Sequence, residues 1–200
     1  MSLRIRPYHP CDLTSLYHIC LLTGNSGTDA SHLFSDPDLI GQFYAAPYAF
    51  FEPELCFTLV SSGFPAGYII GTKNSEDFYH RCEKEWFPFL RERYPKPEVD
   101  NNSLEHRIIQ LVHEGHRPND DLKSYPAHLH IDLLPEVQGK GMGRKLIDVF
   151  IQKLIEFQVP AVQLQVGKKN EGAVKFYERV GFDRIKEYDH SIAFGMKLKS

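Results

Sequence analysis

Apolar residues recur at helical spacing along one long segment of the chain, from Gly143 to Phe157. They place a continuous apolar face on a predicted helix at Leu146, Ile147, Phe150, Ile151, Leu154 and Ile155. The run before this helix, His128 to Leu134, resembles a strand. After Pro160, apolar and polar residues alternate from Ala161 to Val166, which predicts a second strand.

A second amphipathic helix is expected after that strand. Gly167 to Asn170 predicts a turn, Asn170 is a favourable N-cap, and Gly181 is placed to end the helix in a left-handed conformation. The apolar positions of this helix are Ala173, Val174, Phe176, Tyr177 and Val180. Two final strands are predicted over Asp183–Tyr188 and Ser191–Lys199.

The N-terminal part of the chain predicts three strands and two helices. The strands are Leu3–Pro7, Cys56–Ser61 and Ala66–Thr72, the last two joined by a hairpin-like connection. One helix begins after the Asp12 cap and stops at Gly24, and a short one covers Asp38–Ala45.

Residues 73–126 separate the strand that ends at Thr72 from the strand near His128. Ser75 is predicted to cap one helix of this segment and Ser103 another. No linker is evident, so we expect a single domain over residues 1–200 with a helical insertion over 73–126. The order of elements predicts a mixed α/β fold, with helices on both faces of a central sheet.

Composition narrows the class of protein. The 200 residues carry a net charge of −3 with mixed signs, which gives no electrostatic footprint for nucleic acid. No apolar run reaches transmembrane length, and no signal-peptide stretch begins the chain, so we expect no membrane partner. The scattered cysteines (Cys11, Cys20, Cys56 and Cys82) are typical of reduced thiols in a cytoplasmic protein.

The turn between the first strand and helix described above is rich in glycine: Gln138-Gly139-Lys140-Gly141-Met142-Gly143-Arg144. A strand, a glycine turn and a helix together make a cup of backbone N–H groups at the positive end of a helix dipole, which favours a phosphorylated ligand. No Ser or Thr follows a Gly-Lys pair, so the nucleotide triphosphate loop does not fit. The even spacing of the glycines also fails the dinucleotide fingerprint.

The turn resembles the Gln-x-x-Gly-x-Gly/Ala coenzyme A loop of the GNAT N-acetyltransferases. The stretch from Asn170 to Phe182 is similar to the second signature of that family, Asn-x-x-Ala-x-x-Phe-Tyr-x-x-x-Gly-Phe. The resemblance implies a mostly antiparallel twisted sheet of about six or seven strands, with the fourth and fifth strands splayed around the pantetheine arm. It also implies acetyl-CoA as co-substrate and no metal.

A looser resemblance extends to the acetyltransferase-like domain at the C-terminus of O-GlcNAcases. It rests on Tyr125-Pro-Ala-His-Leu-His-Ile-Asp-Leu-Leu-Pro-Glu136 and on the long insertion before it. The likeness to GNAT proteins is firm from Ala127 onward and extends to residues 2–72, but it does not account for residues 73–126.

The GNAT resemblance implies a set of cofactor-binding residues: Leu133, Leu134, Gln138, Gly139, Lys140, Gly141, Met142, Gly143, Arg144, Asn170, Ala173, Phe176 and Tyr177. Tyr177 is the expected acid that protonates the leaving thiol. A backbone N–H near Leu133 is the expected donor to the developing oxyanion.

The base is harder to assign. His128, His130 and Asp132 alternate on one face of their strand. A metal would need a third ligand from elsewhere, and none is marked, so we predict no metal site. Asp132 is the candidate base, which would take the amine proton directly or through water. It could instead bind a cationic substrate, or be a half-exposed strand residue without a role in the reaction. His130 is a lesser candidate, and we expect His113 and His116 at the surface of the insertion.

The sequence says little about the identity of the acceptor. The resemblance implies that residues 25–34 and 46–53 line the acceptor side. The aromatic residues Tyr44, Tyr48, Phe50 and Phe51 could form a wall of such a pocket, but we favour a position in the hydrophobic core for them. The insertion suits either a cover for the pocket or a protein contact.

Two hypotheses follow for the function. One is an N-acetyltransferase, monomer or homodimer, that moves an acetyl group to a primary amine of a small molecule or peptide by direct attack in a ternary complex. The alternative is a pseudo-enzyme that binds acetyl-CoA or a protein partner without turnover.

Overall fold

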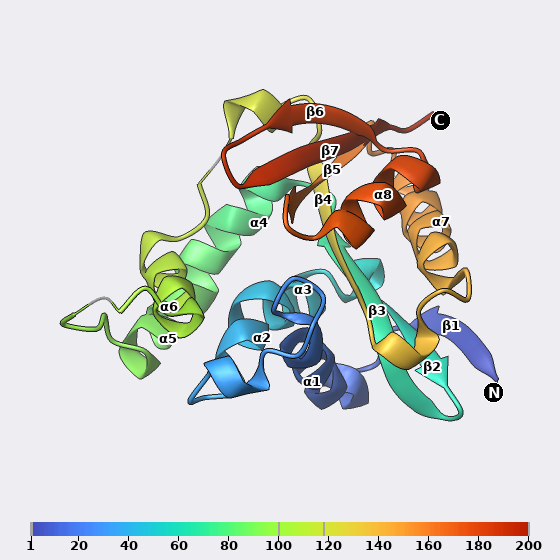
Figure 1. Ribbon diagram of the computed structural model, residues 1–200. Helices are drawn as coiled ribbons and strands as arrows, with labels where there is room; N and C mark the ends of the chain where they lie inside the picture. The colour runs from blue at the N-terminus through green and yellow to red at the C-terminus, as the bar shows by residue number, and fades with distance from the viewer. Residues whose placement is uncertain (1, 100, 118, 200) are drawn as a thin grey trace.

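A computed structural model describes residues 2–99, 101–117 and 119–199. Within these residues the chain forms a seven-stranded sheet in the order β1-β2-β3-β4-β5-β7-β6 (Figure 1). The strands are β1 Leu3–Pro7, β2 Phe57–Ser61, β3 Phe64–Thr72, β4 Ala127–Leu133, β5 Ala161–Gly167, β6 Asp183–Glu187 and β7 Ser191–Lys197. All neighbouring pairs are antiparallel except β4 and β5, which confirms the predicted mixed α/β fold.

The parallel pair β4 and β5 is joined only at its beginning. The register holds at Ala127 with Val162 and at His128 with Gln163, and no pairing continues beyond. Both strands nevertheless run on, to Leu133 and Gly167. The sheet therefore opens at the carboxyl ends of these two strands, as the splay in the predicted fold requires.

Helices cover both faces of the sheet (Figure 1). On one face lie α1 Leu13–Thr23, α2 Leu39–Tyr44 and α3 Ala46–Phe51, and on the other lies α7 Met142–Glu156. Successive residues of a strand point to opposite faces, so Tyr68 and Ile70 of β3 pack with α1–α3 while Ile69 packs with α7. The helix α8 Glu171–Val180 packs beside α7 over the β5–β7 end of the sheet.

The insertion between β3 and β4 is helical, as predicted, with α4 Ser75–Arg81, a π-helical turn Cys82–Trp86, α5 Phe87–Arg93 and α6 Leu104–Glu114. The π-turn interrupts the single helix expected here. Pro88 lacks a backbone N–H and its ring crowds the preceding turn, which accounts for the interruption. The side chain that caps α4 is Asn74, through Glu76 N (3.0 Å), and not the predicted Ser75.

Other local predictions agree more closely with the structure. Ser103 caps α6 through His106 N, Asn170 caps α8 through Ala173 N, and Gly181 ends α8 at φ 100°. The helix α3 was not expected from the sequence, although Pro47 suits its first turn. Among the described residues, no helix combines the length and apolar character needed to cross a membrane.

Candidate active site

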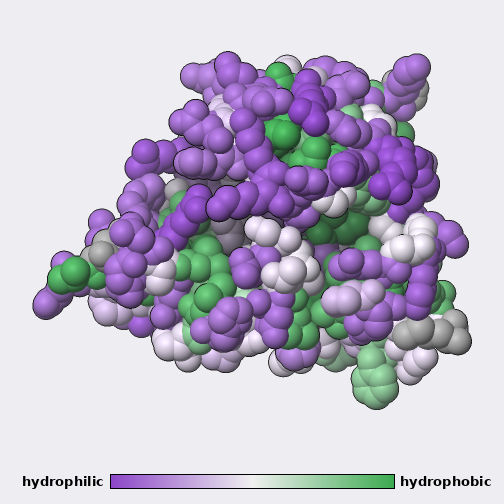
Figure 2. Space-filling model, in the orientation of Figure 1, coloured by the Kyte–Doolittle hydropathy of each residue, from purple (hydrophilic) through white to green (hydrophobic). Residues whose placement is uncertain are grey.

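One cavity of about 1010 Å³ lies where β4 and β5 separate. Its volume is at the upper end of the range usual for small-molecule and cofactor sites. In space-filling view the same face is hollowed between the layer of α8 above and the layer of α1–α3 below (Figure 2). The glycine turn, both parted strands, α8, α1, α2 and α6 all contribute to its lining.

The glycine turn presents open backbone to this cavity. Gly139 and Gly141 have φ of 70° and 73°, and an added Cβ would meet nothing within 4 Å at either position. Gly141 is the N-cap of α7, and no described side chain caps that end of the helix. The first N–H groups of α7 are thus available to an anion such as a phosphate group.

The third glycine of the turn has a packing role. At Gly143 an added Cβ would lie 3.1 Å from the ring of Phe176. A side chain there would crowd the ring of Phe176, which would have to shift slightly to make room. Since both helices line the cavity, Gly143 allows α7 and α8 to pack closely beside it.

Polar side chains around the turn hold it in place. Gln138 Nε2 donates to the carbonyl of Leu133 (2.8 Å), and Arg144 Nη2 donates to the carbonyl of Arg179 at the end of α8 (2.7 Å). Lys140 Nζ donates to the carbonyl of Glu136 (2.6 Å). Gln138 thereby ties the loop to the end of β4, which no spacing rule in the sequence reveals.

The parted edge of β4 offers unpaired backbone groups. Leu134 N donates to Ala66 O of β3 at 2.9 Å. Because N–H groups alternate in direction along a strand, those of Leu133 and Ile131 point the other way, toward the gap before β5. A donor near Leu133 is therefore available where the sequence resemblance expects the oxyanion.

Tyr177 of α8 lies over this gap with its ring in the core and 8% of its surface exposed. Burial raises the pKa of Tyr177, and the negative charge of Asp132 raises it further. The hydroxyl of Tyr177 makes no hydrogen bond with a described residue, and its oxygen is not fully buried. The hydroxyl therefore opens to the cavity that Tyr177 lines. A tyrosine in this setting keeps its proton at neutral pH, as an acid must.

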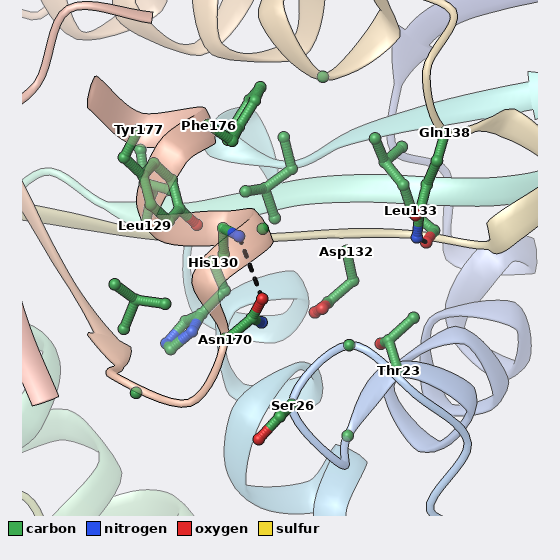
Figure 3. Close-up of a pocket in the computed structure, with 18 of the residues that line it drawn as sticks. Thr23, Ser26, Leu129, His130, Asp132, Leu133, Gln138, Asn170, Phe176 and Tyr177 are labelled. Atoms are coloured by element: carbon green, nitrogen blue, oxygen red, sulfur yellow. Dashed lines mark hydrogen bonds between the residues drawn. The ribbon is translucent and has the colours of Figure 1, made fainter. Parts of the chain in front are cut away.

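Asp132 lies on the opposite side of the gap, facing α1 (Figure 3). Its Oδ2 accepts a hydrogen bond from Tyr68 Oη at 2.6 Å. Burial raises the pKa of Asp132, while hydrogen bonds from Tyr68 and Thr23 act in the lowering direction. The carboxyl is therefore a better proton acceptor than one at the surface.

The predicted residues do not all reach the cavity. Leu133, Gln138, Gly139, Gly141, Gly143, Arg144, Asn170, Ala173, Phe176, Tyr177 and Asp132 line it. Three predicted residues do not line the cavity: Leu134, Lys140 and Met142. Met142, the first residue of α7, is buried in the hydrophobic core instead.

The histidines of β4 are engaged with other side chains. His128 has Tyr48 Oη at 2.7 Å from Nε2 and Ser75 Oγ at 2.7 Å from Nδ1, so neither ring nitrogen is available to a metal. Among the described residues, no group of three or more His, Cys, Asp or Glu side chains is arranged to hold a metal.

The opposite wall of the cavity, on the side where the resemblance expects the acceptor, comes partly from segments that the sequence analysis did not name. It is lined by Cys20, Thr23, Gly24, Ser26 and Gly27 around the end of α1, Ile40 and Tyr44 of α2, and Leu104, Arg107 and Ile108 of α6. The loop after α1 thus lies where it was expected. Residues 46–53 do not line the cavity, and α6 of the insertion takes part instead.

Two expectations about aromatic and histidine residues need correction. Tyr48 and Phe51 belong to the core, but Phe50 is 66% exposed and Tyr44 reaches the cavity. His116 is not at the surface: its ring stacks on Tyr79 at 4.5 Å between centroids, and its Nε2 is buried without a partner. The apolar residues around the insertion are numerous enough to enclose it.

The cavity thus combines an open helix N-terminus, a gap between two strands and a buried tyrosine beside that gap. The sequence matches the family described as "Acetyltransferase (GNAT) family" over residues 28–182, and the chain belongs to this family. Acetyl transfer is the general chemistry that this membership supports.

Relatives extend the comparison. The protein O-GlcNAcase of Rattus norvegicus is 27% identical over 180 residues, which cover 88% of this chain and 20% of that protein. The chain thus spans about a fifth of the length of the O-GlcNAcases that it matches. A mycothiol acetyltransferase of Propionibacterium freudenreichii is 30% identical over 115 residues, 58% of this chain and 35% of that protein.

Solved structures share the fold. The crystal structure of SsHAT superposes with a TM-score of 0.92 at 36% identity and covers 100% of both chains. A structure of yncA from Salmonella typhimurium, described with its cofactor acetyl-CoA, has a TM-score of 0.57 at 12% identity over 100% of this chain and 95% of that one, a likeness of fold alone.

Proposed function

We propose that this protein is an acetyl-CoA-dependent N-acetyltransferase that acts on a primary amine of a small molecule or peptide, by direct attack within a ternary complex. The observation that carries the proposal is that one cavity contains both the open amides of the glycine turn and Asp132, with Tyr177 over the gap between them. A donor held by the turn and an amine beside Asp132 then share one space.

The glycine turn and the gap bind and orient the donor. The amides at the start of α7 hold its diphosphate, and the free backbone of Leu133 and Ile131 pairs with its extended arm. This places the thioester carbonyl next to the N–H of Leu133, which stabilises the charge that develops on oxygen. Acetyl-CoA, when bound, supplies the activated acetyl group.

The side chains around the gap move the protons. An amine must be neutral to attack, and its ordinary pKa is about 8 to 10. Asp132 holds the ammonium form of the acceptor and takes a proton from it, directly or through water. Tyr177 gives its hydroxyl proton to the leaving sulfur, whose thiol has an ordinary pKa of about 8.5.

A thiol-release assay over a panel of primary amines tests the proposal. Steady production of CoA that depends on an added amine, with the acetylated amine found by mass spectrometry, is the expected result. Binding of acetyl-CoA without turnover on amino acids, polyamines, amino sugars and peptide N-termini would favour the alternative, a cofactor-binding pseudo-enzyme.

A further inference from the structure

A chain of buried and partly buried hydrogen bonds runs from the base of the insertion to the cavity. Ser75 Oγ lies 2.7 Å from Pro126 O and 2.7 Å from His128 Nδ1. On the other side of that ring, His128 Nε2 lies 2.7 Å from Tyr48 Oη, which in turn lies 3.1 Å from His130 Nε2. Tyr48 is 1% exposed and His128 is 5% exposed, so water does not compete for the central bond of the chain, between these two side chains.

The direction of each bond follows from its fixed end. A carbonyl oxygen only accepts, so the hydroxyl proton of Ser75 points to Pro126 O, and Ser75 Oγ then accepts from His128 Nδ1–H. A neutral imidazole has one N–H, hence His128 Nε2 is bare and accepts from Tyr48 Oη–H. The oxygen of Tyr48 is left to accept from His130 Nε2–H.

The neutral state of these rings agrees with their surroundings. Burial lowers the pKa of His130 to about 4 and lowers that of His128 well below its usual range. Reversing the chain would leave two oxygens, Ser75 Oγ and Pro126 O, 2.7 Å apart with no proton between them. The geometry therefore favours one direction.

The last atom of the chain is His130 Nδ1, whose lone pair is free in this tautomer. Nδ1 has no hydrogen-bond partner among the described residues, and it is not fully buried. It therefore has access to the cavity that His130 lines. His130 and Asp132 project to the same side of β4, opposite Tyr177 and Phe176 (Figure 3). The acceptor nitrogen has to lie between these groups.

We propose that Ser75, His128 and Tyr48 hold His130 as its Nε2–H tautomer, so that Nδ1 accepts the second proton that the acceptor nitrogen loses. The inference rests on the proposed function. An ammonium group sheds two protons to become an amide nitrogen: the first goes to Asp132, and the second leaves as the new C–N bond forms. At that point the nitrogen is strongly acidic, so even a weakly basic neutral imidazole removes its proton.

The proton count closes. The C–N bond forms and the C–S bond breaks, and Tyr177 O–H gives its proton to the sulfur. His130 returns its acquired proton to the Tyr177 oxygen through water in the cavity, and Asp132 releases its proton to solvent. One proton is released for each acetyl group transferred, and all three side chains return to their starting states.

The relay gives the insertion a definite part in the site. Ser75 is the first residue of α4, Pro126 is the last residue before β4, and Ser75 N also donates to Pro126 O at 2.7 Å. The two ends of the insertion are thus tied together directly at the first member of the chain. Ser75, His128 and Tyr48 are positioning residues, because they act on the acceptor only through His130.

Nitrogen NMR of the histidine rings tests the relay without any turnover. In protein labelled with ¹⁵N-histidine, two-bond ¹H–¹⁵N spectra at pH 7 should give the Nδ1–H tautomer for His128 and the Nε2–H tautomer for His130. The reverse pair of tautomers, or a protonated His130, overturns the proposal. A protein that shows the expected tautomers but acetylates no amine would refute the proposed function and leave the relay as structure only.

A pair of matched variants tests the role in catalysis. Tyr48→Phe removes the hydroxyl from the relay, and Tyr94→Phe removes another hydroxyl bond, to Asp36 (2.7 Å), outside the cavity. We expect kcat to fall by about tenfold or more in Tyr48→Phe, within the range for acid–base catalysis, with the affinity for acetyl-CoA unchanged. Tyr94→Phe should stay within about twofold of wild type.

Equal kcat values in the two tyrosine variants, with the NMR of Tyr48→Phe showing that His130 has lost its single tautomer, would remove the relay from the mechanism. If Tyr48→Phe does not fold, Ser75→Ala provides the same test from the other end of the chain. It frees His128 Nδ1–H, and it should lower kcat and mix the tautomers of both rings. Unchanged kcat and unchanged tautomers in Ser75→Ala also contradict the proposal.

Discussion

The two walls of the cavity are built in different ways. The wall that we propose for the cofactor, called the cofactor wall, comes from β4, the glycine turn, α7, β5 and α8, which follow one another in the chain, and it includes the open backbone of the glycine turn. The wall that we propose for the acceptor, called the acceptor wall, takes side chains from α1, α2 and α6, which are far apart in the sequence. The first wall depends on a few glycines, so it tolerates little change. The second depends on side-chain identity, so changes there should alter the choice of acceptor and leave donor binding intact.

The largest effect is expected from a charge placed in the cofactor wall. Gly141→Asp puts a carboxylate at the N-cap of α7, where the backbone φ of 73° strains any residue other than glycine. Its oxygens would occupy the amides that bind phosphate and repel the diphosphate by about 4 kcal/mol at 4 Å in a surface-like dielectric. Calorimetry should show acetyl-CoA affinity reduced by at least about a hundredfold.

Gly63→Asp is the matched control for that variant. Gly63 has φ 96° and open space around its Cβ, but it lies in the β2–β3 hairpin, outside the cavity. The two variants share the strain of a positive φ, so only Gly141→Asp should lose the ligand. Equal affinity in both would place the donor elsewhere.

A smaller loss, confined to the chemical step, is expected from Tyr177→Phe. Without the hydroxyl the leaving sulfur has no proton donor, so kcat should fall by about a hundredfold, the usual size of general acid catalysis. The Kd for acetyl-CoA should stay near wild type. Tyr188→Phe, which removes a hydroxyl bonded to Asn119 outside the cavity, should have no effect. Near-normal kcat in Tyr177→Phe would exclude Tyr177 as the acid.

A change at Arg107 tests whether the acceptor wall selects the acceptor without affecting the donor. This exposed residue of α6 lines the cavity and makes no ion pair with a described residue, so its charge is available to an acceptor. Arg107→Gln should raise KM by about tenfold for amines that carry a carboxylate or phosphate, the value of one charged hydrogen bond. Uncharged amines and acetyl-CoA should be unaffected. Arg117→Gln, outside the cavity, is the control, and an equal change for both classes of amine would contradict this role.

The last prediction concerns stability and its dependence on pH. Burial lowers the pKa of His116 to about 4, below its ordinary 6.5. Between pH 6.5 and about pH 4, His116 is therefore protonated in the unfolded chain but not in the folded protein. The free energy of unfolding then falls as the pH drops through this range, by up to about 1.4 kcal/mol per pH unit for this residue. Urea unfolding of His116→Phe should show a shallower pH dependence than wild type. An unchanged slope would show that His116 is protonated in the fold.

The same difference between the walls decides what the sequence could foretell. The glycine turn, the Asn170 cap and Gly181 act through local backbone geometry, so their spacing predicts both structure and ligand. The apolar alternation of β4 and β5 likewise predicts the strands around the gap. Where a property belongs to neighbouring residues, periodicity and turn chemistry suffice.

The acceptor wall and the relay depend on contacts between distant segments. Tyr48 meets His128 across 80 positions of sequence, and Arg107 faces the cavity only because α6 packs against α2. The burial of His116 required Phe43 of α2 and the insertion residues Tyr79 and Phe87 to pack around it. No local pattern records such contacts, which is why the sequence favoured the core for Tyr48 without its hydroxyl contacts and why Arg107 was missed.

Amide NMR on adding acetyl-CoA to the wild-type protein tests the central claim most directly. We expect the backbone signals of Gly139, Gly141 and Gly143, together with those of Leu133 and Ile131, to move most and to saturate together at one equivalent per chain. Saturable binding that leaves these five amides in place while signals elsewhere shift would contradict it.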